Sequence, residues 1–297
     1  MNKRQFIYKL YGKYEDDYPE ELRFCEDNNA TLTLLKLITG EIIVKKEGHK
    51  NSTIPRDFSM LQYKVLSDSN KIDKTPFINV FADGVDEEIV GKIKEYLDKD
   101  RTNTSIVKSI LIELSNCLVK YDNCLYSTAF IHIYRMTEYM TFIFPHIYVK
   151  CLNSYKGSYN ALKSFFKSED ELRMFRILRD KIYDKNLILD YEFTFDFSDL
   201  EEDDFLEIKN IFSKNYFEIQ FNYGNDNIKL SFRDMFDFIL SLRNKCFHML
   251  EGTEISYIKI DNSDFDIIFK SITLQIVNWF CVFFIGLTKC AYYGRIC

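Results

Sequence analysis

The stretch "FDFILSLRNKCFHML" (residues 236–250) places three polar side chains in a strongly apolar run. They are Arg243, Asn244 and His248, and His248 is one of only 4 histidines in the chain of 297 residues. Histidine titrates near neutral pH, as a proton-transfer group in hydrolytic chemistry must. The direction in which these three groups point decides whether the stretch is a site or a solvated surface.

Signals on both sides of this stretch predict one helix over residues 232–251. Ser231 and Asp234 have the S-x-x-D spacing of a capping box, and Gly252 is a typical helix terminator. At about 100° per residue, an apolar core stripe is formed by Phe232, Met235, Ile239, Leu242, Cys246 and Leu250. The opposite side is formed by Asp237, Ser241, Asn244 and His248, with Arg243 at the edge of the stripe.

Two interpretations of this polar column are open. On geometry alone it is the solvated face of an amphipathic helix. On chemistry it is a site, because a guanidinium binds phosphate, an amide orients, and an imidazole transfers a proton. The segment "RNKCFH" (243–248) resembles the R-x4-H signature of the HEPN superfamily, which consists largely of ribonucleases. This resemblance favours the site.

A second segment resembles the opening helix of HEPN domains. It is "AFIHIYRMTEYMTFI" (129–143), with the family's aromatic-rich YR-x-x-E pattern at Tyr134, Arg135 and Glu138. The alternative interpretation is a surface ion pair between Arg135 and Glu138 at i,i+3 spacing. In the functional interpretation, Glu138 orients Arg243 or the base.

The resemblance covers roughly residues 104–297 and is greatest to HEPN domains of abortive-infection and other phage-defence proteins. It implies a metal-independent endoribonuclease and toxin, with RNA as substrate, no cofactor, and catalytic residues Arg243, Asn244 and His248. It also implies a homodimer with a composite site, restrained or activated by an antitoxin or a phage-derived trigger. The alternatives are a non-catalytic HEPN-like module that binds protein or nucleotide, and a membrane-perturbing effector.

The other histidines and the cysteines are weaker candidates for functional residues. We expect His132 to be a satisfied core histidine, His146 to follow a helix break at Pro145, and His49 to lie in a polar loop. The 8 cysteines form no C-x-x-C pair, so we expect reduced, mostly buried thiols, with Cys246 packed in the core. The sequence contains no nucleotide-binding glycine motif and no G-x-S-x-G elbow.

Charge and hydropathy narrow the class further. A formal net charge of −6 argues against indiscriminate coating of nucleic acid but permits a local RNA site. The acidic run 199–207 is typical of a solvated helix N-terminus rather than a metal site. The apolar stretch 271–288 is interrupted by Gln275 and Asn278, which favours a buried core helix over a membrane span. The amino-terminal residues lack the apolar run of a signal peptide, and we expect a cytoplasmic protein.

The fold class is predicted to be mainly α, in two domains. Residues 1–103 form a small β-containing or α+β domain, with strands at 30–37 and 41–46 around a Thr39–Gly40 hairpin, another at 75–84, and a helix from Asp86. The polar segment 98–104 is the boundary. Residues 104–297 form a HEPN-like helical bundle with helices at 105–121, 123–150 and 169–184, and a β insertion near 191–230. That insertion departs from the HEPN pattern.

Overall fold

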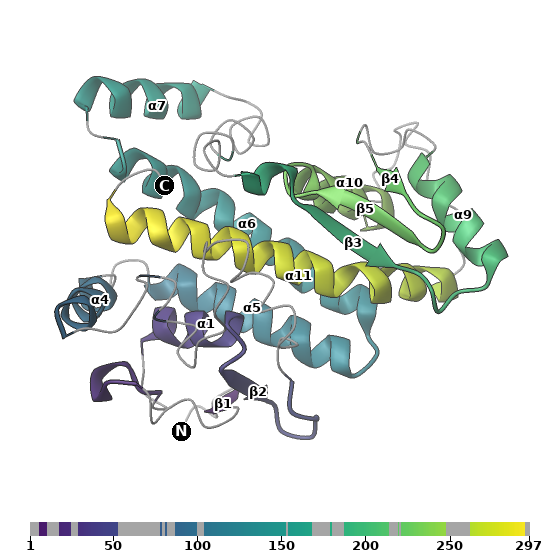
Figure 1. Ribbon diagram of the computed structural model, residues 1–297, viewed down its shortest axis with the longest axis horizontal. Coiled ribbons are helices and arrows are strands. Elements are labelled where there is room, and N and C mark those ends of the chain that lie inside the picture. Colours follow the sequence, from purple (N-terminus) through teal and green to yellow (C-terminus); the bar gives the residue numbers. More distant parts are fainter. Residues whose placement is uncertain are drawn as a thin grey trace.

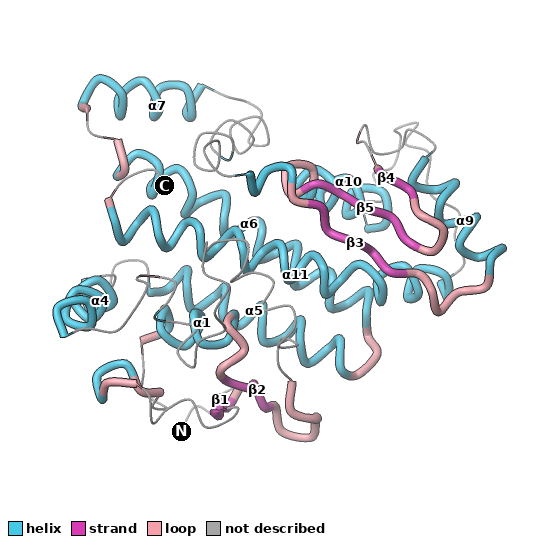
Figure 2. The backbone as a smooth tube through the Cα atoms, viewed as in Figure 1, coloured by secondary structure: helices cyan, strands magenta, loops and turns pink. Residues whose placement is uncertain are grey.

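The computed structural model describes residues 6–10, 18–24, 29–52, 78, 81, 87–99, 104–152, 154–167, 179, 187–213, 219, 221–247 and 262–294. Within these ranges the chain is mainly helical with small antiparallel sheets, as predicted (Figure 1). Figure 2 shows the helices grouped around one long central pair, with strands at two separate places.

The centre of the fold is built from α5 (Thr104–Asp122), α6 (Tyr126–Lys150) and α11 (Asn262–Tyr293). α6 packs against both α5 and α11. The predicted helices at 105–121 and 123–150 are therefore confirmed. Pro145 was expected to kink or end this helix, and the ending is wrong, because α6 continues through Pro145 to Lys150. Buried Phe144 and Tyr148 on either side of the proline continue the core stripe, and Phe144 lies 5.2 Å from Phe283 between ring centroids.

Helix α11 confirms the predicted buried core helix. Among the described residues, Asp266–Tyr293 has the length and hydropathy to cross a membrane, but 72% of its most apolar window is buried inside the protein. The ring of Trp279 and the side chain of Asn278 are both almost fully buried. The apolar character of this helix is accounted for by core packing.

One of the strands predicted for the amino-terminal region is wrong. Residues 30–37 were expected to form a strand, but α1 (Ala30–Ile38) is a helix, capped by the Asn29 side chain, which accepts a hydrogen bond from the Thr31 amide at 2.8 Å. Nearly every side chain of α1 is buried, so its alternating threonines and leucines do not mark two faces. Gly40, at φ 73°, ends this helix in place of the predicted hairpin turn.

The strand predicted at 41–46 is confirmed as β2 (Ile42–Lys45), which pairs antiparallel with β1 (Ile7–Leu10). The helix predicted from Asp86 is confirmed as α4 (Glu87–Lys99). Of the strand predicted at 75–84, Ile78 is helical and Phe81 lies in a turn, and the other residues lie outside the described ranges.

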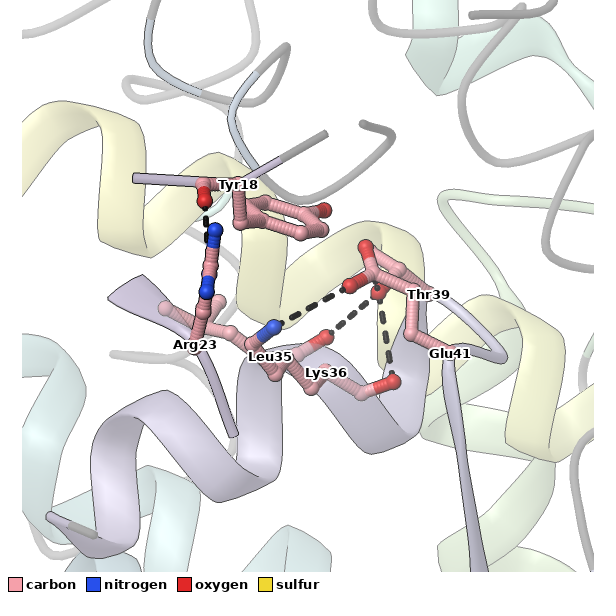
Figure 3. A network of polar contacts seen from close by, with 6 residues as sticks. All are labelled: Tyr18, Arg23, Leu35, Lys36, Thr39 and Glu41. Carbon is pink, nitrogen blue, oxygen red and sulfur yellow. Dashed lines mark hydrogen bonds and ion pairs between the residues drawn. The ribbon is translucent and has the colours of Figure 1, made fainter. Parts of the chain in front are cut away.

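A buried polar network holds the end of α1 (Figure 3). Lys36 has no exposed surface, and its Nζ lies 3.6 Å from Glu41 Oε2 and 3.9 Å from the ring centroid of Tyr18. Thr39 Oγ1 lies 2.9 Å from the Leu35 carbonyl and 3.1 Å from Glu41 Oε1. A buried charge needs a partner of this kind, because its hydration is lost.

These amino-terminal elements lie directly on the helical bundle. α1 and β2 both pack against α5, and Tyr8 Oη and Ser115 Oγ, 107 positions apart, share a hydrogen bond of 3.0 Å. The domain boundary at 98–104 stays a prediction.

The β insertion is confirmed. It contains β3 (Glu192–Asp196), α9 (Glu202–Ser213), β4 (Asn222–Tyr223) and β5 (Asn227–Ser231), with strand order β3-β5-β4. A one-turn helix, η4 (Leu187–Asp190), precedes it, as η2 (Glu20–Leu22) precedes α1. The acidic run begins α9, with Glu202, Asp203 and Asp204 exposed in its first turn, as interpreted. Of the helix predicted at 169–184, only Arg179 is described, and it is helical. Helix α7 (Tyr155–Lys167) was not predicted from the sequence.

Candidate functional site

The motif segment lies on α10 (Met235–Phe247). The Asp234 amide donates to Ser231 Oγ at 3.2 Å, and Ser231 Oγ donates to Asp234 Oδ2 at 2.8 Å, so the predicted capping contact forms. The helix begins three residues later than predicted, because residues 232–234 form a turn and the first helical bond runs from the Phe238 amide to the Asp234 carbonyl at 2.9 Å.

The two predicted sides of this helix are present. The core stripe is almost fully buried at Phe232, Met235, Ile239 and Leu242. Cys246 is partly buried and packs against the same core. On the other side, Asp237 and Ser241 are half-buried and Asn244 is exposed. α10 packs against α6, and the ring of Phe236 lies 6.5 Å from that of Trp279 on α11, so the polar side of α10 has a fixed direction.

The side chain of Arg243 contacts an aromatic ring of the neighbouring helix α6. Its guanidinium carbon is 4.7 Å from the ring centroid of Tyr134, and its Nη1 donates to Asn244 Oδ1 at 2.9 Å. The hydrogen bond to Asn244 uses one N–H of the guanidinium, and the other N–H groups can donate to further acceptors. The structure thus brings Arg243, Asn244 and Tyr134 together from two helices.

Arg135 and Glu138 lie elsewhere on α6. Arg135 Nη1 is 3.8 Å from Glu113 Oε1 on α5, and its side chain is half exposed. Glu138 is exposed one turn beyond Tyr134. Among the contacts of the described residues, Glu138 forms no ion pair with Arg243 or with Arg135. The role of Glu138 as an orienting group stays a prediction.

His248 lies outside the described residues, since the description of α10 ends at Phe247. The described part of the site is therefore its cationic half. Within the described residues, no group of three or more His, Cys, Asp or Glu side chains has a metal-binding arrangement.

The sequence did not show the contact between His132 and Glu113. His132 Nδ1 lies 2.6 Å from Glu113 Oε2, and both side chains are about seven-eighths buried. A satisfied histidine was expected, and the partner is on the preceding helix. Since α5 and α6 are consecutive helices joined by a short turn, they run antiparallel, and Glu113, nine residues before the end of α5, meets His132, six residues after the start of α6. The expected helix break before His146 is wrong, because α6 is continuous through this residue. The His146 side chain is exposed.

Comparison with protein-family models, with curated proteins and with solved structures gives no match.

Proposed function

We propose that this chain is a metal-independent endoribonuclease of the HEPN type. The observation that carries the proposal is the position of Arg243, which is partly buried over the ring of Tyr134 and hydrogen-bonded to the exposed Asn244. A guanidinium fixed on one face presents its remaining donors in a defined direction, which suits the fork-like binding of a phosphate.

The reaction is a displacement within the RNA strand. His248 accepts the proton of a ribose 2′-hydroxyl, and that oxygen attacks the neighbouring phosphorus. The bond from phosphorus to the 5′-oxygen breaks, and the leaving oxygen takes up a proton. Arg243 stabilises the negative charge that develops on the phosphoryl oxygens, and Asn244 orients Arg243 through the bond described above. The products carry a 2′,3′-cyclic phosphate and a free 5′-hydroxyl.

Two copies of the chain build the complete site. Arg243 and His248 are five positions apart, which is about 140° around one helix. One helix cannot direct both side chains at a single phosphate, whereas two copies facing each other across a two-fold axis can. The motif helix would then lie at the interface between protomers.

The biological role that fits this chemistry is a cytoplasmic toxin of phage defence. Unrestrained RNA cleavage harms its own cell, so an antitoxin or a phage-derived trigger would control it.

The test uses purified protein and a labelled RNA in EDTA. The wild-type protein, free of antitoxin and with any trigger present, should cleave, and Arg243→Ala and His248→Ala should each lose cleavage. Arg233→Ala is the matched control, because Arg233 lies in the turn just before α10, is about half exposed, and pairs with Asp190 at 3.6 Å. Cleavage that persists in folded His248→Ala, or that requires divalent ions, would contradict the proposal. Tight RNA or nucleotide binding with no cleavage would favour the non-catalytic module.

A further inference from the structure

Helix α7 packs against the end of α6. The Gly157 amide donates to Ser154 Oγ at 2.9 Å, which caps α7, and Ser158 Oγ donates to the Val149 carbonyl of α6 at 3.5 Å. The half-buried side of α7 consists of Gly157, Ser158, Ala161 and Leu162. Figure 1 shows α7 and α10 on the same side of α6 and α11, with α1 and α5 on the other side.

The opposite side of α7 is aromatic and basic. Tyr155 is 99% exposed and Tyr159 is 62% exposed, and Lys156 and Lys163 are exposed beside them. At about 100° per residue these four positions fall within an arc of about 100°. Lys163 Nζ lies 5.9 Å from the ring centroid of Tyr159. The sequence of α7, "YKGSYNALKSFFK", has no acidic residue, although the chain carries a net charge of −6.

Neither tyrosine ring contributes to the core, so the attachment of α7 does not explain them. Flat rings at the surface stack with unpaired bases, and lysines beside them attract the phosphates of the same strand. Amphipathic helices that lie on membranes instead carry leucine, phenylalanine or tryptophan on the inserted side. The described rings of this face, Tyr155 and Tyr159, are both tyrosines.

We propose that the Tyr155–Tyr159 face of α7 binds single-stranded RNA and holds a substrate strand for the Arg243 site. This inference rests on the proposed function. The Arg243 site lies at Tyr134, and α7 packs near Lys150, the last residue of α6. These two positions are sixteen residues apart, about 24 Å along the helix axis. A bound strand would therefore span about that distance. Arg135, Phe142 and His146 are exposed on one stripe of α6 between the two places. Glu138 lies on the same stripe, so the lysines of α7 provide the main attraction for phosphate.

The binding test uses a fluorescent 20-nucleotide 2′-O-methyl oligouridine, which lacks the attacking hydroxyl and so stays intact. Fluorescence anisotropy should show affinity falling about tenfold or more in Tyr155→Ala/Tyr159→Ala, since each stacked base contributes substantially. Tyr155→Phe/Tyr159→Phe should bind as wild type, because the rings remain. Tyr223→Ala is the matched control, as Tyr223 is an exposed tyrosine with Lys209 Nζ 5.4 Å from its ring centroid.

The contribution of the two lysines to RNA binding is tested by varying the salt concentration. In Lys156→Gln/Lys163→Gln the slope of log affinity against log salt should fall by about 0.7 for each lost phosphate contact. An unchanged affinity in the alanine double variant overturns the inference. So does a variant that keeps its RNA affinity but loses binding to phosphatidylserine vesicles, which would identify a membrane surface.

Cleavage separates this inference from the proposed function. A dinucleotide is too short to reach from Arg243 to α7, so the tyrosine variants should cleave it as wild type does, whereas Arg243→Ala should not. Long single strands should be cut more slowly by the tyrosine variants. If the wild-type protein cuts no RNA but binds the oligouridine through these tyrosines, the endonuclease proposal fails and the α7 site stands.

Discussion

Trp279 Nε1 of α11 donates a hydrogen bond to the carbonyl oxygen of Phe232 at 3.1 Å. Both side chains are almost fully buried, and their ring centroids are 6.0 Å apart. Phe232 lies in the turn that leads into α10, so this bond fixes the start of α10 against α11. The position of Arg243 over Tyr134 depends on where α10 starts.

Trp279→Phe should therefore destabilise the protein and disturb the site. The substitution keeps an aromatic ring but leaves the buried carbonyl of Phe232 without this donor, which costs about 1–3 kcal/mol. Urea denaturation measures the free energy of unfolding. Tyr155→Phe, at a fully exposed position, is the control and should change it by less than about 0.5 kcal/mol. Equal stability of Trp279→Phe and wild type would show that the bond does not hold the turn.

The stacking of Arg243 on Tyr134 predicts a graded response to substitution of the ring. Tyr134→Phe keeps the aromatic face, and RNA cleavage should stay near the wild-type rate. Tyr134→Leu removes it, and kcat/KM should fall about two- to fivefold, as expected for a cation–π contact of about 0.5–1 kcal/mol. Steady-state cleavage of a labelled RNA measures both. A larger loss in Tyr134→Phe than in Tyr134→Leu would show that the hydroxyl, not the ring, acts on Arg243.

Long periodic segments were predictable from the sequence. The stripes of α5, α6 and α10 repeat over several turns, and a pattern of that length specifies a helix with one buried side. α1 was missed because it is buried on nearly all sides and shows no helical periodicity, so its threonines suggested a strand. The cap at Asn29 was the available signal, since its side chain accepts from the Thr31 amide.

The site was predictable only in part. The polar side of α10 follows from the position of its apolar stripe. Which residue of α6 lies under Arg243 does not follow from spacing within either segment, because it depends on how the two helices pack. Tyr134 was named among the supporting residues through the YR-x-x-E resemblance, and the structure places its ring there. Arg135, from the same pattern, pairs with Glu113 instead.

The buried Lys36–Glu41 pair predicts opposite results for single and double substitutions. Glu41→Gln leaves the Lys36 ammonium buried without its countercharge and should cost about 3–5 kcal/mol. Lys36→Met/Glu41→Leu removes both charges and should be close to neutral. Denaturant titration of the two variants gives the difference. A double variant as unstable as Glu41→Gln would show that the hydrogen bonds of Glu41, not its charge, stabilise the end of α1.

The five-residue spacing of Arg243 and His248, about 140° around a helix, predicts a dimer whose site is shared. Light scattering should give twice the chain mass of 35.5 kDa. If each site takes Arg243 from one copy and His248 from the other, an equal mixture of Arg243→Ala and His248→Ala should recover roughly a quarter of wild-type cleavage after subunit exchange, through the one intact site of each mixed dimer. A monomer with full activity would contradict the composite site.

The contact between Tyr8 and Ser115 predicts how stability depends on alkaline pH. Burial raises the pKa of Tyr8 to about 12, with the Ser115 hydrogen bond acting in the opposite direction. In the unfolded chain a tyrosine has a pKa of about 10. The folded state therefore keeps this proton while the unfolded state releases it, and the stabilisation from Tyr8 is complete below pH 10 and is lost as the pH rises toward 12.

Tyr8→Phe removes this titration and the hydrogen bond that joins β1 to α5. Below pH 10 the variant should be less stable by about 0.5–1.5 kcal/mol, the usual contribution of one hydrogen bond. Urea denaturation from pH 8 to pH 11.5 should show the wild-type advantage shrinking above pH 10, while other tyrosines affect both proteins equally. An advantage that stays constant over this range would show that the Tyr8 hydroxyl titrates alike in the folded and unfolded chains. The amino-terminal strand would then be open to water at this point, and its docking on the helical bundle would depend on α1 rather than on β1.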